Sequence, residues 1–257
     1  MAARRNLNRW APWIFLAALL TFWELGVRLF GIDEFVLPSA SASFRALYDN
    51  FGPIMKNTWP TFWTTMVGFG LGIVVGALLG VIIGSSAFMY AGLFPLLVAF
   101  NAIPKAAFVP ILIVWFGIGV VPATLTAFLI CFFPITVNIA TGLATLEPEL
   151  EDVLRALGAS RADILFKVGL PRSLPYFFAS LKVAITLAFV GSIVSELTAA
   201  NEGIGQLMLA ASSTMRVPLM FAGLIVISVM AMVMYVAFAT LERRMTGWAT
   251  RGMNTPG

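Results

Sequence analysis

The chain has 257 residues, of which 60% are apolar and 11% are charged, and its mean hydropathy is strongly positive. A soluble globular domain carries about 25% charged residues, so this composition excludes one and predicts a polytopic membrane protein. The net charge of +4 is scattered among the loops, which is not the basic face that nucleic-acid binding needs.

Missing residue types narrow the function further. Histidine, the commonest general base and a common metal ligand, is absent, and the single cysteine, Cys131, permits no intrachain disulfide. No Gly-Lys dipeptide occurs, so the chain lacks the phosphate-binding loop of an ATPase. We therefore expect no catalytic residues, no metal site and no cofactor in this chain, and any ATPase must be a separate polypeptide.

The first predicted span covers residues 10–30 and follows three arginines near the N-terminus. Glu24 and Arg28 are four residues apart on this helix, so their side chains are expected to pair near its end. A polar-to-amphipathic stretch follows, beginning at Leu37-Pro38-Ser39.

The second predicted span, residues 62–84, has a glycine at every fourth position. These are Gly72, Gly76, Gly80 and Gly84. A face of this kind lets another helix approach closely. The partner is either another span of this chain or a second copy of it, and we favour packing within the chain.

The third predicted span, residues 92–117, is interrupted by prolines, including Pro104 and Pro110. Irregular backbone at membrane depth must be covered by protein or a wet cavity, so we expect this span inside the bundle. Lys105 is the only charge between Asn57 and Leu146. Two explanations stay open: Lys105 lines a path for a solute, or its ammonium binds carbonyls freed by the prolines.

The remaining predicted spans cover residues 122–143, 176–197 and 218–241. Glu196 is the only carboxylate in the fifth span and is a further candidate for the path. The chain has no internal repeat and no second domain, so residues 1–257 are expected to form one all-α transmembrane bundle of about six helices.

The charged stretch 146–175 separates the fourth span from the fifth. Its apolar residues repeat at helical spacing: Leu146, Leu150, Val153, Leu154 and Leu157. Pro148 suits the first turn of this amphipathic helix, and Gly158 suits a left-handed end. Ser160 and Asp163 can cap a second helix, which we expect to end at Leu170-Pro171.

This hairpin resembles the cytoplasmic coupling loop of bacterial ABC importer permeases. The family frame has an acidic residue, two small residues, a glycine six positions after the acid, and a later hydrophobic-x-Leu-Pro. Here it falls on Asp152, Val153, Leu154, Gly158, Val168, Leu170 and Pro171, with Ala159 and Ser160 after the glycine. Asp152 replaces the usual glutamate, and the pair after it is bulkier than in the family.

Two further stretches resemble the permeases for sulfonates, taurine and nitrate: Leu37-Pro38-Ser39, and NAIPKAAFVPILIVWFGIG at residues 101–119. The resemblance implies two permease copies, two ATPase subunits that bind ATP, and an extracytoplasmic solute-binding protein, assembled in the lipid of a bacterial inner membrane. The implied solutes are small anions such as sulfonates, taurine, nitrate or bicarbonate. Pyrimidine precursors of thiamine, as in a related branch, are the first alternative.

The second alternative is an ion-coupled secondary transporter. Such a protein would be expected to show an inverted repeat and carboxylates within corresponding spans, and the sequence has neither. An integral membrane enzyme would need a catalytic cluster, which is also absent.

Positive charge predicts the orientation. The N-terminal segment, the hairpin and the C-terminal tail carry ten Lys and Arg, against three in the loops on the other side. The positive-inside rule therefore predicts that both termini and the hairpin are cytoplasmic.

Overall fold

The computed structural model describes residues 2–145 and 148–246. Within these ranges every regular element is a helix, which confirms the all-α class. In chain order they are α1 (Ala2–Leu29), α2 (Ala40–Asp49), α3 (Phe51–Gly84), α4 (Ala87–Ala102), a 3-10 turn η1 (Lys105–Phe108), α5 (Val109–Phe116), α6 (Val120–Ala144), α7 (Pro148–Ala156), α8 (Arg161–Ile164), a π-helical turn η2 (Leu165–Gly169), α9 (Leu170–Thr198), α10 (Ile204–Ser213) and α11 (Val217–Met245).

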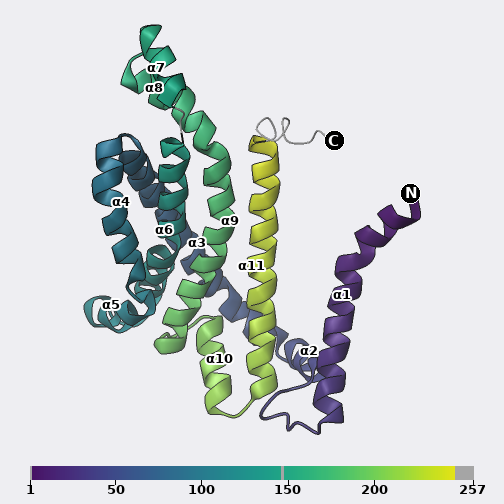
Figure 1. The fold of residues 1–257 in the computed structure, drawn as a ribbon. Helices are drawn as coiled ribbons and strands as arrows, with labels where there is room; N and C mark the ends of the chain where they lie inside the picture. The colour runs from purple at the N-terminus through teal and green to yellow at the C-terminus, as the bar shows by residue number, and fades with distance from the viewer. Residues whose placement is uncertain (1, 146–147, 247–257) are drawn as a thin grey trace.

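The number of apolar helices agrees with the prediction of about six spans. Five are long and apolar enough to cross a bilayer: the part of α1 from Trp10, α3, α6, the run Arg161–Thr198, and α11. The sixth is a bent pair, in which α4 meets η1 and α5 at 74°. The described start of α1 and the end of α11 lie toward the end of the bundle that carries α7 and α8 (Figure 1).

The predicted end of the hairpin's second helix at Leu170-Pro171 is wrong. The helix continues from α8 through η2 into α9, and the Leu170 N–H donates to the Leu165 carbonyl in the wider π-helical pattern. The wider turn accommodates a proline, which has no N–H and would clash with the carbonyl four residues back in a regular helix. The hairpin is therefore joined to α9 by continuous helix.

The centre of the bundle is α6, which packs on α3 and on α9. The glycine face of α3 lies against α6. A Cβ atom on Gly76 would be 2.9 Å from the Phe132 carbonyl oxygen, and one on Gly80 would be 2.7 Å from Ile139 Cβ. The glycines thus serve packing within the chain, which confirms the favoured alternative.

A second apolar cluster joins α10 and α11 to the start of α3. It consists of Ile54, Ile204, Leu207, Ala222, Val226 and Ile227. Helix α10 fills the space between α9 and α11 at the end of the bundle away from α7 and α8 (Figure 1).

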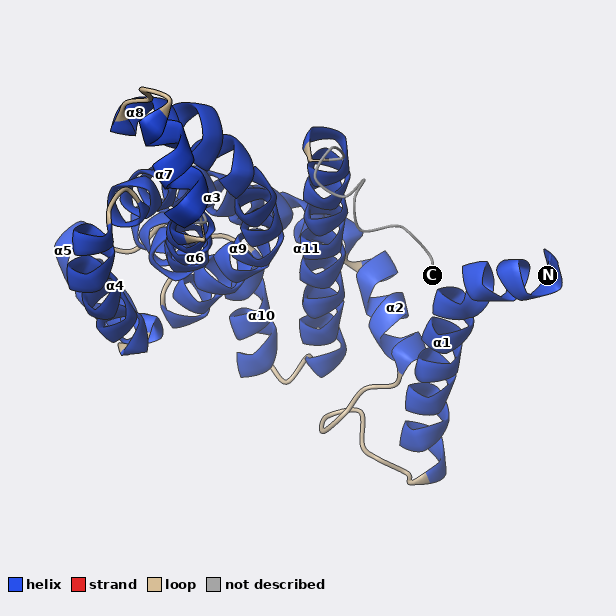
Figure 2. Cartoon of the chain, turned by 45° about the horizontal axis from the view of Figure 1, so that its top comes forward, coloured by secondary structure: helices blue, strands red, loops and turns tan. Residues whose placement is uncertain are grey.

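Helix α1 stands apart from the bundle (Figures 1 and 2). Contacts with the rest of the protein lie near the C-terminal end of α1. The Trp23 and Phe221 rings are 5.8 Å apart, and Trp23 Nε1 donates to the Pro38 carbonyl at 3.0 Å. The predicted pair of Glu24 and Arg28 is confirmed at 2.5 Å.

Candidate functional site

The hairpin of α7 and α8 projects beyond the ends of α6 and α9 (Figure 1). Gly158 turns the chain with a positive φ of +87°, as the sequence predicted. Its N–H donates to the Arg155 carbonyl at 2.9 Å, and the Ala159 N–H donates to the Leu154 carbonyl at 3.0 Å. These bonds satisfy carbonyls at the end of α7, so the glycine ends one helix and aims the next.

The predicted cap of the second hairpin helix is also confirmed. The Asp163 N–H donates to Ser160 Oγ at 3.1 Å, and the Ser160 N–H donates to Asp163 Oδ2 at 3.3 Å. This reciprocal pair is a capping box. Lys167 lies 2.5 Å from Asp163 one turn further on, so three side chains hold the start of α8.

The hairpin carries apolar side chains that this chain leaves uncovered. Leu157 is 80% exposed, Phe166 is 64% exposed and Val153 is 56% exposed. Exposed apolar side chains on a projecting, well-capped element are available for contact with a partner or with lipid.

The predicted hairpin residues divide by position. Asp152, Val153, Gly158 and Ser160 are exposed, Leu154 and Ala159 are half-buried, and Val168, Leu170 and Pro171 are half-buried where the hairpin joins the bundle. A cleft of about 760 Å³ separates the hairpin from the turn between α3 and α4, with Ser86, Arg155 and Leu165 in its walls. The hairpin thus contacts the bundle mainly at its base.

The broken span lies at an edge of the molecule, beside α6 (Figures 1 and 2). The prediction that it lies inside the bundle is wrong for the single chain, because α4 has no buried residue and α5 buries only Val109 and Leu112. Trp115, on α5, is 69% exposed. A second chain or lipid would have to cover this apolar face.

Lys105 sits at the break, half-buried, directly after Pro104. Its Nζ donates to the Asn101 carbonyl at 2.6 Å and to Asn101 Oδ1 at 2.5 Å, and it lies 5.7 Å from the centre of the Phe133 ring. In a continuous α-helix the Asn101 carbonyl would accept from the backbone N–H of residue 105, four positions later. The observed contact is of the kind that the structural explanation for Lys105 predicts. Pro110 is the second residue of α5, in its first turn.

Glu196 is only 2% exposed and does not approach Lys105 in an ion pair among the described residues. Its Oε2 accepts from the Gly205 N–H and from the Thr61 hydroxyl, each at 2.9 Å. The structure thus separates the two charged residues that the sequence suggested for a path, and Glu196 lies within the subunit.

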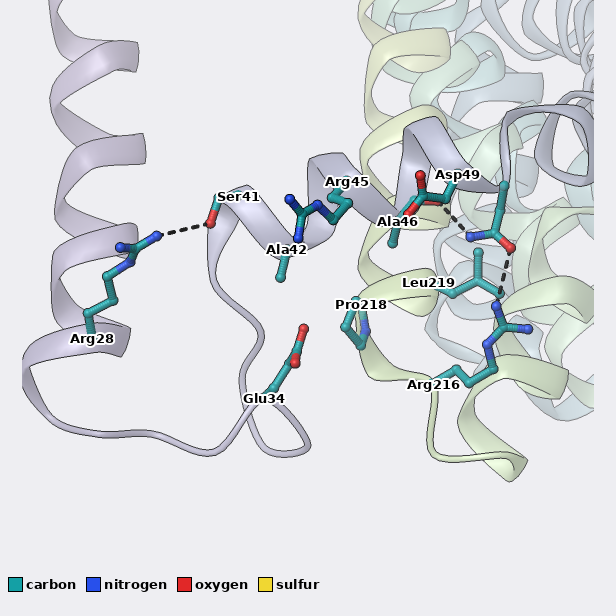
Figure 3. Close-up of a pocket in the computed structure, with 11 residues that line it drawn as sticks. Arg28, Glu34, Ser41, Ala42, Arg45, Ala46, Asp49, Arg216, Pro218 and Leu219 are labelled. Carbon is teal, nitrogen blue, oxygen red and sulfur yellow. Dashed lines mark hydrogen bonds between the residues drawn. The ribbon is translucent and has the colours of Figure 1, made fainter.

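A charged cleft at the end opposite the hairpin was not singled out from the sequence. It has a volume of about 640 Å³ and includes Arg28, Glu34, Arg45, Asp49 and Arg216 (Figure 3). These residues come from α1, the following loop, α2 and the residue directly before α11. No local motif marks the cleft, since only the fold brings these four parts of the chain together.

A bundle of about six apolar helices, with one span broken at prolines and a capped amphipathic hairpin projecting from one end, defines a multi-pass membrane protein. The family of binding-protein-dependent transport system inner membrane components matches residues 72–247. The chain belongs to this family and is a transport subunit. Family membership decides against the ion-coupled secondary transporter.

Sequence similarity to named relatives extends over nearly the whole chain. It is 29% identical over 246 residues to the formylaminopyrimidine transport permease protein ThiX of Halalkalibacterium halodurans, covering 95% of this chain and 98% of the relative. It is 26% identical to the taurine transport system permease protein TauC of Escherichia coli over 240 residues, covering 91% and 87%. The fold is similar to a chain of the MetNI methionine ABC transporter in an inward-facing conformation, with a TM-score of 0.67 and 21% identity over 77% of this chain and 98% of that one.

Proposed function

We propose that this chain is the permease subunit of an ATP-driven ABC importer that carries a small anionic solute, of the sulfonate, taurine, nitrate or bicarbonate type, into the cytoplasm. The observation that carries the proposal is the hairpin α7/α8, which is rigidly capped, projects from the bundle and exposes Val153 and Leu157. Such an element suits a groove on a separate ATPase, which binds the ATP.

The hairpin is proposed to transmit force because α8 runs without a break into α9. A displacement of the hairpin by an ATPase would act directly on a membrane span. The family frame at Asp152, Leu154 and Gly158 forms the docking element, and Val168, Leu170 and Pro171 form its base.

Copurification tests the proposal. Leu157→Asp places a charge where an ATPase groove would bury an apolar side chain, so the ATPase should be lost from the purified complex. Leu209→Asp is the matched control, because Leu209 is 45% exposed at the opposite end, on α10, and the ATPase should be retained. Equal retention in both variants, or a wild-type chain that transports without an ATPase, would reject the proposal.

Two further partners belong to the proposal. A second copy of this chain would cover the apolar face of α4 and α5, and an extracytoplasmic solute-binding protein would act at the end opposite the hairpin. In this orientation both termini and the hairpin are cytoplasmic, in agreement with the excess of positive charge on that side.

The solute path is proposed to pass the broken span. The face of α4 and α5 is open in the single chain, and Lys105 between Pro104 and Pro110 is the only cation on it. An ammonium there gives an anion a positive waypoint. Glu196 is not proposed to contact the solute. It acts on the path through the positions of α3, α9 and α10, which its hydrogen bonds connect.

The second candidate solute is a pyrimidine of the thiamine-precursor type. The observation that favours it is the 29% identity to a formylaminopyrimidine permease over nearly both full lengths. Uptake assays that offer taurine and formylaminopyrimidine separately, with the cognate binding protein, distinguish the two classes.

A further inference from the structure

Helix α10 begins inside the protein, where its first backbone N–H groups cannot reach water. A helix start leaves such groups without partners in its own helix. Here side chains of two other helices accept from them: Gly203 N–H donates to Asn57 Oδ1 at 3.0 Å, Ile204 N–H to Thr61 Oγ1 at 2.8 Å, and Gly205 N–H to Glu196 Oε2 at 2.9 Å. The start of α10 is therefore capped by α3, which is far away in the sequence, and by the end of α9, which directly precedes α10.

Glu196 is the centre of this arrangement. Besides Gly205, its carboxylate accepts from the Thr61 hydroxyl at 2.9 Å and from the Ser192 hydroxyl at 3.5 Å. A carboxylate that is only 2% exposed needs such donors, and the positive end of the α10 dipole further favours an anion at this point. The Thr61 hydroxyl connects three helices. Its oxygen accepts from the Ile204 N–H of α10, and its hydrogen is donated to Glu196 of α9, while Thr61 itself belongs to α3.

Two glycines make room for the carboxylate. A Cβ atom on Gly203 would lie 2.5 Å from Glu196 Oε2, and one on Gly205 would lie 2.6 Å from Glu196 Cβ. Gly203 also has a φ of +112°, which side-chain-bearing residues rarely adopt. The start of α10 and the end of α9 are thus shaped to fit each other.

We propose that Glu196 is a positioning residue that, through Thr61, locks α10 onto α3 and α9, so that these three helices move as one body during transport. Helix α10 has ten residues and cannot cross a bilayer, yet it closes the bundle between α9 and α11. Apolar contacts of Ile204 and Leu207 bury one face of α10, and the hydrogen bonds to Thr61 and to the buried carboxyl group of Glu196 fix its position.

Thiol accessibility tests the lock in the full-length protein in membranes. In a Cys131→Ser background, Leu207→Cys supplies a probe on α10 at a position that is 8% exposed. Thr61→Val removes the shared hydroxyl and should raise the rate of thiol labelling at position 207 by about tenfold or more, since a hydrogen bond to a charged group is worth about that factor. Glu196→Gln keeps a side-chain oxygen that can accept from Thr61 and Gly205, so its effect should be smaller.

The matched control is Thr65→Val. Thr65 lies one turn further along α3 and is equally buried, but its hydroxyl donates to the Thr61 carbonyl of its own helix. Labelling at position 207 should stay at the wild-type rate. A second probe, Ile139→Cys on α6, is 4% exposed and should remain protected in every variant.

Equal labelling rates in Thr61→Val and Thr65→Val would overturn the lock, and so would equal acceleration at positions 207 and 139, because that pattern means general unfolding. The transport arm rests on the proposed function: solute uptake should fall in Thr61→Val at an unchanged amount of protein. The labelling result does not depend on what is transported, so a failure of the lock and a failure of the proposed function are distinguishable.

Discussion

Glycines of α3 differ in what surrounds them. A Cβ atom on Gly80 would lie 2.7 Å from Ile139 Cβ and 2.9 Å from the Thr136 carbonyl oxygen, whereas one on Gly70 would meet nothing within 4 Å. The same residue type therefore has a packing role at one position and none at another position of one helix.

This difference gives a matched pair of variants. Gly80→Ala should lower the stability of the purified protein by about 1 to 3 kcal/mol, because the methyl group pushes α3 away from α6. Gly70→Ala should leave stability unchanged or raise it slightly, since alanine favours a helix. Thermal unfolding in detergent measures both, and a similar loss in the two variants would contradict the proposed contact.

Lys105 gives a second prediction at the residue scale. If it is a waypoint for an anion, Lys105→Met should reduce uptake of an anionic solute while the amount of assembled complex stays constant. If Lys105 mainly satisfies the Asn101 carbonyl, assembly itself should weaken, because that carbonyl loses its partner. Quantified uptake and complex yield separate the two explanations, and normal values of both would contradict each of them.

At the scale of elements, we propose that the hairpin and the fifth span form one mechanical unit. The apolar helix Arg161–Thr198 carries the capped start of α8 at one end and Glu196 near the other. Helices transmit displacement along their axis far better than loops do, because every turn is hydrogen-bonded to the next. The proposed coupling surface and the proposed lock of α10 therefore lie on the same helix.

The turn at Gly158 tests this unit. Gly158→Val places a β-branched side chain at a φ of +87°, at a local cost of about 1 kcal/mol or more, and should tilt α7 relative to α8. Transport and solute-stimulated ATP hydrolysis should fall while the protein still inserts into the membrane.

The control for this variant introduces the same type of strain elsewhere. Gly31 has a φ of +58° and, like Gly158, open space around a Cβ atom, but it follows α1 at the end away from the hairpin. Gly31→Val should therefore leave ATP hydrolysis coupled to transport. Unimpaired coupling in Gly158→Val would show that the hairpin is not the coupling element.

At the scale of the whole molecule, the bundle has two structurally different ends. The described end of α11 and the hairpin lie toward one end, while α2, α10 and the charged cleft with Arg45 and Arg216 lie at the other (Figures 1 and 3). The excess of Lys and Arg predicts that the hairpin end is cytoplasmic.

Labelling from either side checks the orientation. In a Cys131→Ser background, Ser160→Cys on the hairpin and Asp49→Cys on α2 are both exposed positions at opposite ends. An impermeant thiol reagent should reach position 49 only from outside and position 160 only from inside. Labelling of both positions from one side would reject the orientation and the number of spans together.

Much of this protein follows from the sequence by itself. The class, the number of apolar helices, the ion pair of Glu24 and Arg28, the turn at Gly158 and the capping box at Ser160 were all predictable. Each depends on residues that are adjacent or a few positions apart, so local periodicity, apolar length and backbone preference determine them.

Only the tertiary structure decided which helices meet. It paired the glycines of α3 with α6, placed the broken span at an edge, collected the charged cleft and brought Glu196 to the start of α10. It also carried the helix through Pro171, where a local rule predicted a stop. The physical reason is that the spans are all similarly apolar, so hydropathy does not tell which of them pack together. Contacts such as that of Thr61 with Glu196 depend on how side chains more than a hundred positions apart fit together in space.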